Sequence, residues 1–86
     1  MNFEFDINKS ISNFEKHGID FEQAQLLWND FNLLSLDARS TDEPRTLHIG
    51  KIRENHWTAI TTNRNNNIRI ISVRRARQNE IELYES

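Results

Sequence analysis

The chain has 86 residues and a mass of 10.3 kDa, which is enough for a single domain of residues 1–86 and for no second one. It contains no cysteine, which excludes disulfides, thiolate metal sites and a cysteine nucleophile. The net charge of −2 divides unevenly, because residues 1–43 carry nine acidic and three basic side chains, whereas residues 44–86 carry four acidic and eight basic ones. The basic half either meets a phosphate backbone or is simply solvated.

The beginning of the chain predicts a short strand and an amphipathic helix. Residues 2–5 alternate apolar and polar side chains, as a strand does. Asp6 has the position of an N-cap. The helix that follows places three apolar residues at the spacing of one face, namely Ile7, Ile11 and Phe14. Gly18 ends this helix, and Asn13 is expected to link it to the sheet.

A second helix is predicted directly after the first. Asp20 is its N-cap, and Gln23, three residues later, completes a capping box. The apolar side chains of this helix fall on one face, which comprises Phe21, Ala24, Leu27, Trp28 and Phe31. The two helices are therefore joined by only a short turn.

After Asn32 the spacing of apolar residues changes from that of a helix to that of a strand. Four strands are expected, at residues 33–36, 45–53, 56–62 and 68–73. A polar loop at residues 37–44 and an Asn-rich turn at residues 63–67 separate two pairs of them. Short connections between successive strands favour antiparallel pairing, so a meander sheet is predicted.

A final helix is expected from Arg74 to Glu85. Arg74, Arg75 and Arg77 would begin it, where positive charge opposes the helix dipole, so a bound anion or a carboxylate partner is expected near them. Glu80 and Tyr84 lie four residues apart and share a face of this helix. The alternative to a functional role for Glu80 is an ion pair with Arg77 or Arg74.

Helices before and after an antiparallel sheet give the α+β class. No stretch of the sequence is long and apolar enough to cross a membrane. The N-terminal residues do not have the pattern of a signal peptide, so a cytoplasmic location is expected.

Several polar side chains could carry chemistry. The three histidines, His17, His48 and His56, lack the spacing of metal ligands, so no metal is expected. The sequence also lacks a Gly-rich loop that could cradle a nucleotide, so no cofactor is expected. Lys9 and His17 lie about two turns apart on one side of the first helix. Arg69 interrupts an apolar strand and is either a solvent-facing residue or a cation displayed on the sheet. Cleavage of RNA through the ribose 2′-hydroxyl needs a base, a cation at the phosphate and an acid, all of which such side chains can supply.

Three spaced blocks of residues carry a resemblance to a known family. The first block comprises Phe5, Asp6, Lys9, Asn13, Lys16, His17, Gly18, Ile19, Phe21, Glu22 and Ala24. The other two comprise Glu43, Arg45, Ile49 and Gly50, and then residues 69–72, Arg74, Ala76, Glu80 and Tyr84. In order and spacing these blocks resemble the BrnT family of toxins from bacterial type II toxin–antitoxin pairs. Phe5 departs from the family, which usually has Trp there, and keeps an aromatic side chain.

The resemblance implies a RelE-like fold and a metal-independent endoribonuclease that cleaves RNA and inhibits translation and growth. It also implies a BrnA-like antitoxin with a ribbon-helix-helix part that masks the toxin, and a complex that binds operator DNA and represses its own operon. The motif positions of the family fall here on Lys9, His17, Arg45, Arg69, Arg74, Glu80 and Tyr84. Of these, Arg69 and Arg74 are expected to hold the scissile phosphate.

The other roles follow from the chemistry of the side chains. Glu80 or His17 is the expected general base, and Tyr84 or Lys9 is the expected proton donor or phosphate ligand. Two alternatives to an active enzyme are a catalytically inactive protein that binds an antitoxin and a small RNA-binding module. The net charge of −2 counts against the second, because such modules depend on a basic groove and on stacking aromatics.

Overall fold

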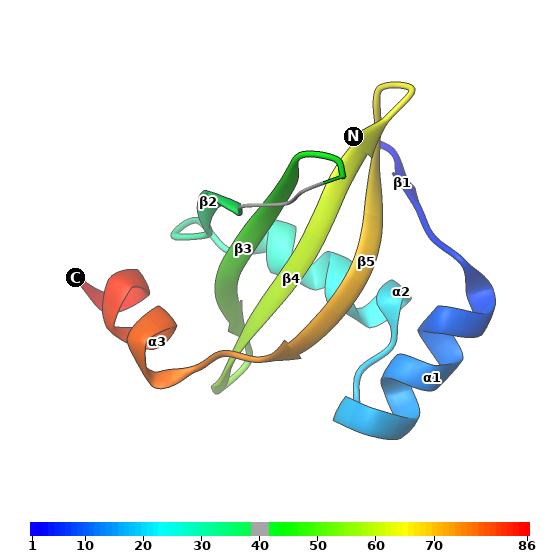
Figure 1. The fold of residues 1–86 in the computed structure, drawn as a ribbon. Helices are drawn as coiled ribbons and strands as arrows, with labels where there is room; N and C mark the ends of the chain where they lie inside the picture. The colour runs from blue at the N-terminus through cyan, green and yellow to red at the C-terminus, as the bar shows by residue number, and fades with distance from the viewer. Residues whose placement is uncertain (39–41) are drawn as a thin grey trace.

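The computed structural model describes residues 1–38 and 42–86 of the chain. Within these residues, three α-helices, one 3₁₀ helix and five strands follow one another (Figure 1). In chain order the elements are β1 (Phe3–Glu4), α1 (Ile7–His17), α2 (Phe21–Ala24), the 3₁₀ helix η1 (Gln25–Asn29), β2 (Leu34–Ala38), β3 (Arg45–Ile52), β4 (Asn55–Arg64), β5 (Asn67–Arg75) and α3 (Gln78–Glu85). The predicted α+β class is confirmed.

The five strands form one mixed sheet in the order β1-β5-β4-β3-β2. The strands from β2 to β5 pair antiparallel with their neighbours in sequence, which is the arrangement of a meander. β1 departs from that pattern because it pairs parallel to β5, with Phe3 opposite Ile68 and Glu4 opposite Arg69. The first and the last strand of the chain therefore lie side by side, and β5 is an interior strand.

A β-bulge in β5 alters which side chains share a face of the sheet. Ile60 pairs with Ser72, but its neighbour Thr61 pairs with Ile70, so Ile71 is an extra residue between two paired ones. From Ile71 onward the alternation of side chains is displaced by one position. In a regular strand, residues an even number of positions apart share a face. Across the bulge this rule is reversed, so a residue before Ile71 and a residue after it share a face when they are an odd number of positions apart.

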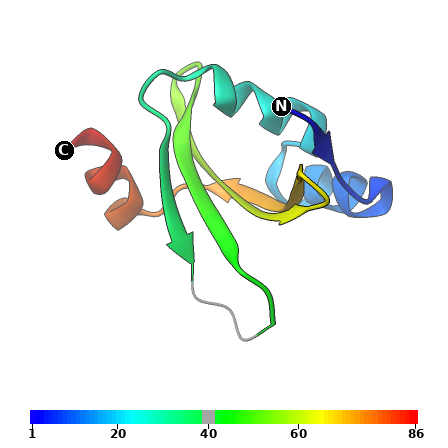
Figure 2. The same ribbon diagram turned by 90° about the horizontal axis from the view of Figure 1, so that it is seen from above.

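The hydrophobic core lies between one face of the sheet and the helices α1 and α2 (Figures 1 and 2). Its buried apolar side chains are Ile19, Phe21, Ala24, Leu27, Trp57, Ala59, Ile70 and Val73. α3 lies on the other side, where it packs near β3 and leaves most of that face uncovered (Figure 2). We call the side with α1 and α2 the helix face and the other side the open face.

The helix ends predicted from capping residues are confirmed. Asp6 Oδ1 accepts from the backbone N–H of Asn8 at 2.8 Å, and Gly18 takes the left-handed conformation with φ of 78°. Asp20 and Gln23 form the expected capping box at the start of α2. Local capping chemistry is therefore sufficient to place these boundaries.

α1 turns a polar side toward the core, contrary to what its amphipathic spacing predicts. Its three apolar residues are each more than half exposed, namely Ile7, Ile11 and Phe14. Ser10 and Asn13 are buried instead. Ser10 Oγ accepts from the backbone N–H of Phe21 at 2.9 Å, and Asn13 Nδ2 donates to the carbonyl of Val73 at 2.9 Å. The helix docks this way because its buried polar groups find backbone partners, which apolar spacing does not reveal.

Two predicted boundaries are wrong. The second helix tightens into η1 and ends at Asn29, so Phe31 lies in a turn with a fully exposed ring instead of on the apolar face. Arg74 and Arg75 belong to β5 and do not begin a helix. They extend the ladder with β4, so α3 begins only at Gln78.

The two predicted connections are shorter than expected. Of the loop predicted at residues 37–44, the first two residues extend β2, and residues 39–41 lie outside the described residues. The Asn-rich turn narrows to Asn65 and Asn66, with φ of 52° and 68°. Two consecutive positive φ values are typical of a two-residue hairpin turn, and Asn tolerates them well.

Candidate functional site

Arg69 and Arg74 project from the same face of β5 although five residues separate them. In a regular strand, an odd separation places two side chains on opposite faces. The bulge residue Ile71 restores them to one face, the open face. Their cross-strand partners agree with this placement, because Glu4 lies opposite Arg69 and Thr58 lies opposite Arg74. The open face therefore carries two arginines along one strand.

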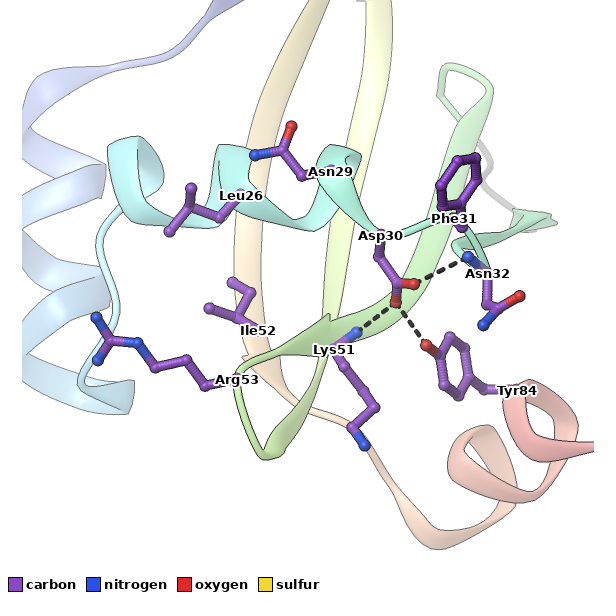
Figure 3. A pocket seen from close by; sticks show the side chains of 9 residues that line it. All are labelled: Leu26, Asn29, Asp30, Phe31, Asn32, Lys51, Ile52, Arg53 and Tyr84. Atoms are coloured by element: carbon purple, nitrogen blue, oxygen red, sulfur yellow. Dashed lines mark hydrogen bonds between the residues drawn. The ribbon is translucent and has the colours of Figure 1, made fainter.

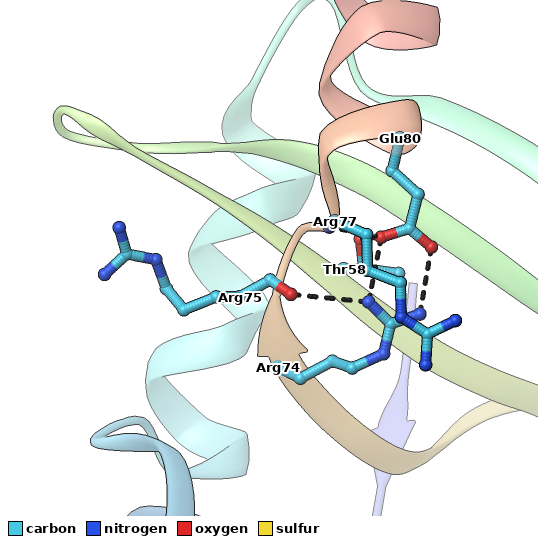
Figure 4. Close-up of polar contacts among 5 residues, drawn as sticks. All are labelled: Thr58, Arg74, Arg75, Arg77 and Glu80. Carbon is cyan, nitrogen blue, oxygen red and sulfur yellow. Dashed lines mark hydrogen bonds and ion pairs between the residues drawn. The ribbon is translucent and has the colours of Figure 1, made fainter.

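Arg74 forms a two-point ion pair with Glu80 of α3 (Figure 4). Its Nη1 donates to Oε1 at 2.8 Å and its Nη2 donates to Oε2 at 2.9 Å. Nη1 also donates to the carbonyl of Arg75 at 3.3 Å. The pairing of Glu80 with Arg74, one of the two partners predicted for it, is confirmed. The contact fixes the plane of the guanidinium, which still has N–H groups to offer to another acceptor.

Glu80 is nearly buried, with 7% of its side chain exposed, and it receives further hydrogen bonds. Its Oε1 accepts from the backbone N–H of Arg77 at 2.8 Å and from the hydroxyl of Thr58 at 2.9 Å. Hydrogen bonding by Arg74, opposed by burial and supported by Arg77 and Thr58, lowers the pKa of Glu80 to about 2. A carboxylate that stays ionised and is already saturated with donors is a poor general base. The geometry makes Glu80 a positioning residue for Arg74.

Arg69 pairs with Glu4 of β1 across the parallel ladder. Nη1 donates to Glu4 Oε2 at 2.9 Å, and Asn67 Nδ2 donates to Glu4 Oε1 at 3.1 Å. These hydrogen bonds, from Asn67 and Arg69, lower the pKa of Glu4. The side chains of Arg69 and Glu4 are 26% and 30% exposed, and ion pairs this accessible contribute little to stability. A phosphate can therefore compete with Glu4 for Arg69 at small cost.

Arg45 supplies a third guanidinium to the open face. Thr46 of β3 pairs with Thr61 of β4, so the next residues along the ladder, Arg45 and Thr62, lie opposite each other. Thr62 also pairs with Arg69 of β5, so the three residues form one row across the sheet. The Nε of Arg45 is buried and has no hydrogen-bond partner among the described residues. An unpaired buried donor is costly, so this side chain gains nothing at its Nε from the fold itself.

Tyr84, one helical turn after Glu80, is held by Asp30 (Figure 3). Its hydroxyl donates to Asp30 Oδ2 at 2.5 Å, and the same carboxylate accepts from the backbone N–H groups of Lys51 at 2.8 Å and Asn32 at 2.9 Å. Burial and the hydrogen bond to Asp30 raise the pKa of Tyr84 to about 12. The hydroxyl therefore keeps its proton at neutral pH, and in this arrangement that proton is directed at Asp30.

His56 lies next to Tyr84, although the sequence did not predict it as a site residue. Its Nε2 lies 2.7 Å from Glu85 Oε2, and its ring meets the ring of Tyr84 edge-on, with centroids 5.4 Å apart. In the neutral tautomer that carries its proton on Nε2, the ring donates to the carboxylate and Nδ1 is an acceptor. The signal that could have found it is its spacing in β4, two residues before Thr58, which puts both side chains on the open face.

Lys9 and His17 do not join the other predicted site residues. Both are exposed on α1, which packs against β5 from the helix face. Arg45, Arg69, Arg74, Glu80 and Tyr84 gather on or beside the open face instead. The structure therefore brings together five of the seven predicted residues and leaves two on the other side of the sheet.

His48, on the helix face, is a buried residue of the fold. Its Nδ1 lies 2.8 Å from Ser35 Oγ and its Nε2 lies 2.8 Å from Thr61 Oγ1, while its ring packs against Trp28 with centroids 4.8 Å apart. Burial lowers the pKa of His48. Across residues 1–38 and 42–86, no cluster of three or more side chains has the arrangement of a metal site.

Comparison with known proteins identifies one family. A family model described as the ribonuclease toxin BrnT of type II toxin–antitoxin systems matches residues 5–80. No curated protein matches the chain. The matched segment contains the three arginines and Glu80 and ends before Tyr84. None of the helices in the described parts of the chain has the length and apolar character that a membrane span requires.

Proposed function

The chain belongs to the BrnT family of ribonuclease toxins of type II toxin–antitoxin systems, and on that premise we propose that it cleaves RNA on the open face of the sheet. The family implies RNA as the substrate and an antitoxin as the partner. One observation carries the location: three arginines lie on the face that α3 leaves mostly uncovered, and Glu80, the partner of one of them, lies one helical turn before a tyrosine that is fixed by a hydrogen bond. The arginines are Arg45, Arg69 and Arg74.

The proposed phosphate contacts divide between the two ends of this face. Arg74 pairs with Glu80, which lies one helical turn before Tyr84, and it holds the scissile phosphate, because Glu80 fixes its guanidinium there. Arg45 and Arg69 lie further along the strands, with the row of Ile60 and Ser72 between them and Arg74. They hold neighbouring phosphates. Guanidinium groups suit this role because they are always charged and bind phosphate oxygens in pairs.

The proposed reaction is transfer of the phosphoryl group to the ribose 2′-oxygen. His56 Nδ1 takes the proton of the 2′-hydroxyl, the 2′-oxygen attacks phosphorus, and the bond from phosphorus to the 5′-oxygen breaks. Tyr84 turns its O–H from Asp30 to that leaving oxygen and donates its proton there, because an alkoxide is a stronger base than a phenolate. The products are a 2′,3′-cyclic phosphate and a 5′-hydroxyl. Lys9 and His17 contribute nothing to this phosphate in the proposal, because they lie across the sheet.

The finer features of the proposal rest on the family. They are a RelE-like fold for the single domain, catalysis without a metal, inhibition of translation and growth, and action in the cytoplasm. The proposed partner is a BrnA-like antitoxin with a ribbon-helix-helix part, and the proposed complex binds operator DNA and represses its own operon. The open face supports the masking role, because a partner laid across it would cover all three arginines.

The test is induction of this gene alone, with growth and RNA integrity followed in the same cultures. We expect growth arrest with cleaved RNA for the wild type and neither for Arg74→Ala or Tyr84→Ala. Lys16→Ala, which removes an exposed cation from α1, is the matched control and keeps full toxicity. Normal growth with intact RNA from well-expressed, folded wild-type protein would instead indicate a protein that only binds its partner.

A further inference from the structure

A hollow of about 630 Å³ opens beside Tyr84, where the turn after η1, the end of β3 and α3 meet (Figure 3). The side chains on its wall that matter here are Asn29, Asp30, Phe31, Lys51, Arg53 and Tyr84. They come from three segments far apart in sequence. The reaction proposed above uses only Tyr84 from this set, so the other groups need a separate account.

The wall of this hollow is built rigidly around one carboxylate. Asp30 joins α3 through Tyr84, β3 through the N–H of Lys51, and its own turn through the N–H of Asn32. Gly50 lets the carboxylate come this close, because a Cβ there would lie 3.1 Å from Asp30 Oδ2 and 2.8 Å from Leu33 Cδ1. A site held by three elements is organised before any ligand arrives.

The groups around Asp30 suit an aromatic, hydrogen-bonding ligand beside a negative charge. Phe31 is fully exposed, so its ring gains nothing from the fold, but it offers a flat surface for stacking. Lys51 brings a positive charge beside Asp30, whose oxygens are already engaged, and Arg53 adds a second positive charge at the far end of the hollow (Figure 3). Asn29 adds an amide, which can both donate and accept, as a base edge requires.

We propose that this hollow binds one nucleobase of the RNA, next to the phosphate that Arg74 holds. This inference rests on the proposed function. Tyr84 and Glu80 lie four residues apart on α3, about one helical turn, so the hollow adjoins the Arg74 end of the open face. Phe31 stacks on the base, and Lys51 and Arg53 attract the flanking backbone. A protein partner fits less well, because a docking helix would place apolar surface against two cations.

The test measures binding of a short RNA whose riboses carry 2′-O-methyl groups, so that it cannot be cleaved, by fluorescence anisotropy. Stacking on an aromatic side chain is typically worth about 1–3 kcal/mol per base, so Phe31→Ala should weaken binding by a factor between about five and about 150. Phe31→Tyr keeps the ring and should bind as the wild type does. Leu83→Ala removes another half-exposed apolar side chain and is the matched control.

An oligonucleotide with one abasic position separates stacking from general loss of contact. The abasic position is moved along the strand, one nucleotide at a time. If a base occupies the hollow, one abasic position weakens binding to the wild type but does not weaken binding to Phe31→Ala any further. Equal affinity of Phe31→Ala and wild type, together with weaker binding by Arg74→Ala, overturns the base site and leaves the RNA site standing. If Phe31→Ala lost affinity for the antitoxin but not for RNA, the hollow would be a protein contact, and the proposed base site would be overturned too. Failure of the wild type to bind any RNA contradicts the proposed function itself.

Discussion

The side chain of Asn13 and the backbone of Val73, sixty residues apart, hydrogen-bond in both directions. Asn13 Nδ2 donates to the Val73 carbonyl at 2.9 Å, and Asn13 Oδ1 accepts from the Val73 N–H at 3.2 Å. Nδ2 also donates to the carbonyl of Ile19 at 2.8 Å. β1 has only two residues, and they pair with Ile68 and Arg69 at the beginning of β5. Further along β5, the side-chain amide of Asn13 supplies the hydrogen bonds to Val73 that a longer neighbouring strand would have made.

Asn13→Ala should lower the free energy of unfolding by about 2–4 kcal/mol, because it leaves buried backbone groups of β5 without partners. Urea unfolding followed by tryptophan fluorescence measures the change. Asn8→Ala, on the same helix but exposed, is the matched control and should change stability by less than about 0.5 kcal/mol. Equal stability of the two variants would show that Asn13 does not hold α1 to the sheet.

Glu80→Gln should destabilise the fold by about 3 kcal/mol at neutral pH, because it leaves Arg74 without its charged partner in a poorly exposed place. Glu82→Gln, on the exposed side of the same helix, should have little effect. If Glu80→Gln were as stable as Glu82→Gln, the ion pair would not be what anchors α3. Chemical denaturation of both proteins under the same conditions decides between these outcomes.

The contribution of Glu80 should depend on pH in a defined direction. Its pKa is lowered from 4.5 to about 2 in the folded protein, so folding favours the ionised form. The stabilisation is therefore fully present above pH 4.5 and is lost as the pH falls toward about 2. The stability difference between wild type and Glu80→Gln should shrink over that range, and a constant difference would contradict the assignment.

His48 should make the fold less stable in mild acid. Burial lowers its pKa, so the unfolded chain binds a proton more readily than the folded protein does. The stabilisation is present above about pH 6.5, the ordinary value, and declines as the pH falls below it. Thermal melts between pH 7.5 and 5.5 should show a smaller decline for His48→Gln than for the wild type. His17→Gln, exposed on α1, should leave the decline as it is.

Arg69→Ala should weaken RNA binding and reduce the dependence of log Kd on log salt by about one phosphate contact. Glu4→Gln should not weaken binding, since it frees Arg69 from a competing carboxylate. Lys16→Ala serves as the charge-matched control on the other side of the sheet. Salt titrations with an uncleavable RNA give all three slopes. Identical slopes for Arg69→Ala and wild type would remove Arg69 from the RNA site.

Tyr84→Phe should lower the single-turnover cleavage rate by about a hundred-fold or more while leaving RNA affinity nearly unchanged, because it removes only the proposed proton donor. The phenyl ring keeps its edge contact with His56, so the packing of α3 should survive. Circular dichroism melts provide the control for folding. An unchanged cleavage rate would exclude the Tyr84 hydroxyl from the reaction.

Local chemistry was enough to predict the capped helix ends and the antiparallel order of the strands from β2 to β5. Capping by Asp6, Gly18 and Asp20 acts within a few residues and could be read directly. The docking face of α1 could not, because it depends on backbone groups of β5 that the helix meets only in the folded chain.

The site shows the same limit. Charge and spacing drew attention to Arg69, Arg74, Glu80 and Tyr84, but not to Asp30, which meets Tyr84 across 54 residues. The prediction that Arg74 begins a helix is also wrong, because the pairing of this residue with β4 outweighs its local pattern. Partners that come from distant segments leave no trace in the spacing of neighbours.

The bulge at Ile71 makes the number of residues in β5, and not only their identity, a determinant of the site. Removing one residue there would restore regular alternation and turn Arg69 toward the core while Arg74 kept its place. A substitution abolishes one cation, whereas a deletion of a single codon would separate two intact cations onto opposite sides of a sheet. For this toxin the simplest route to inactivity that preserves every charged residue is therefore a change in length.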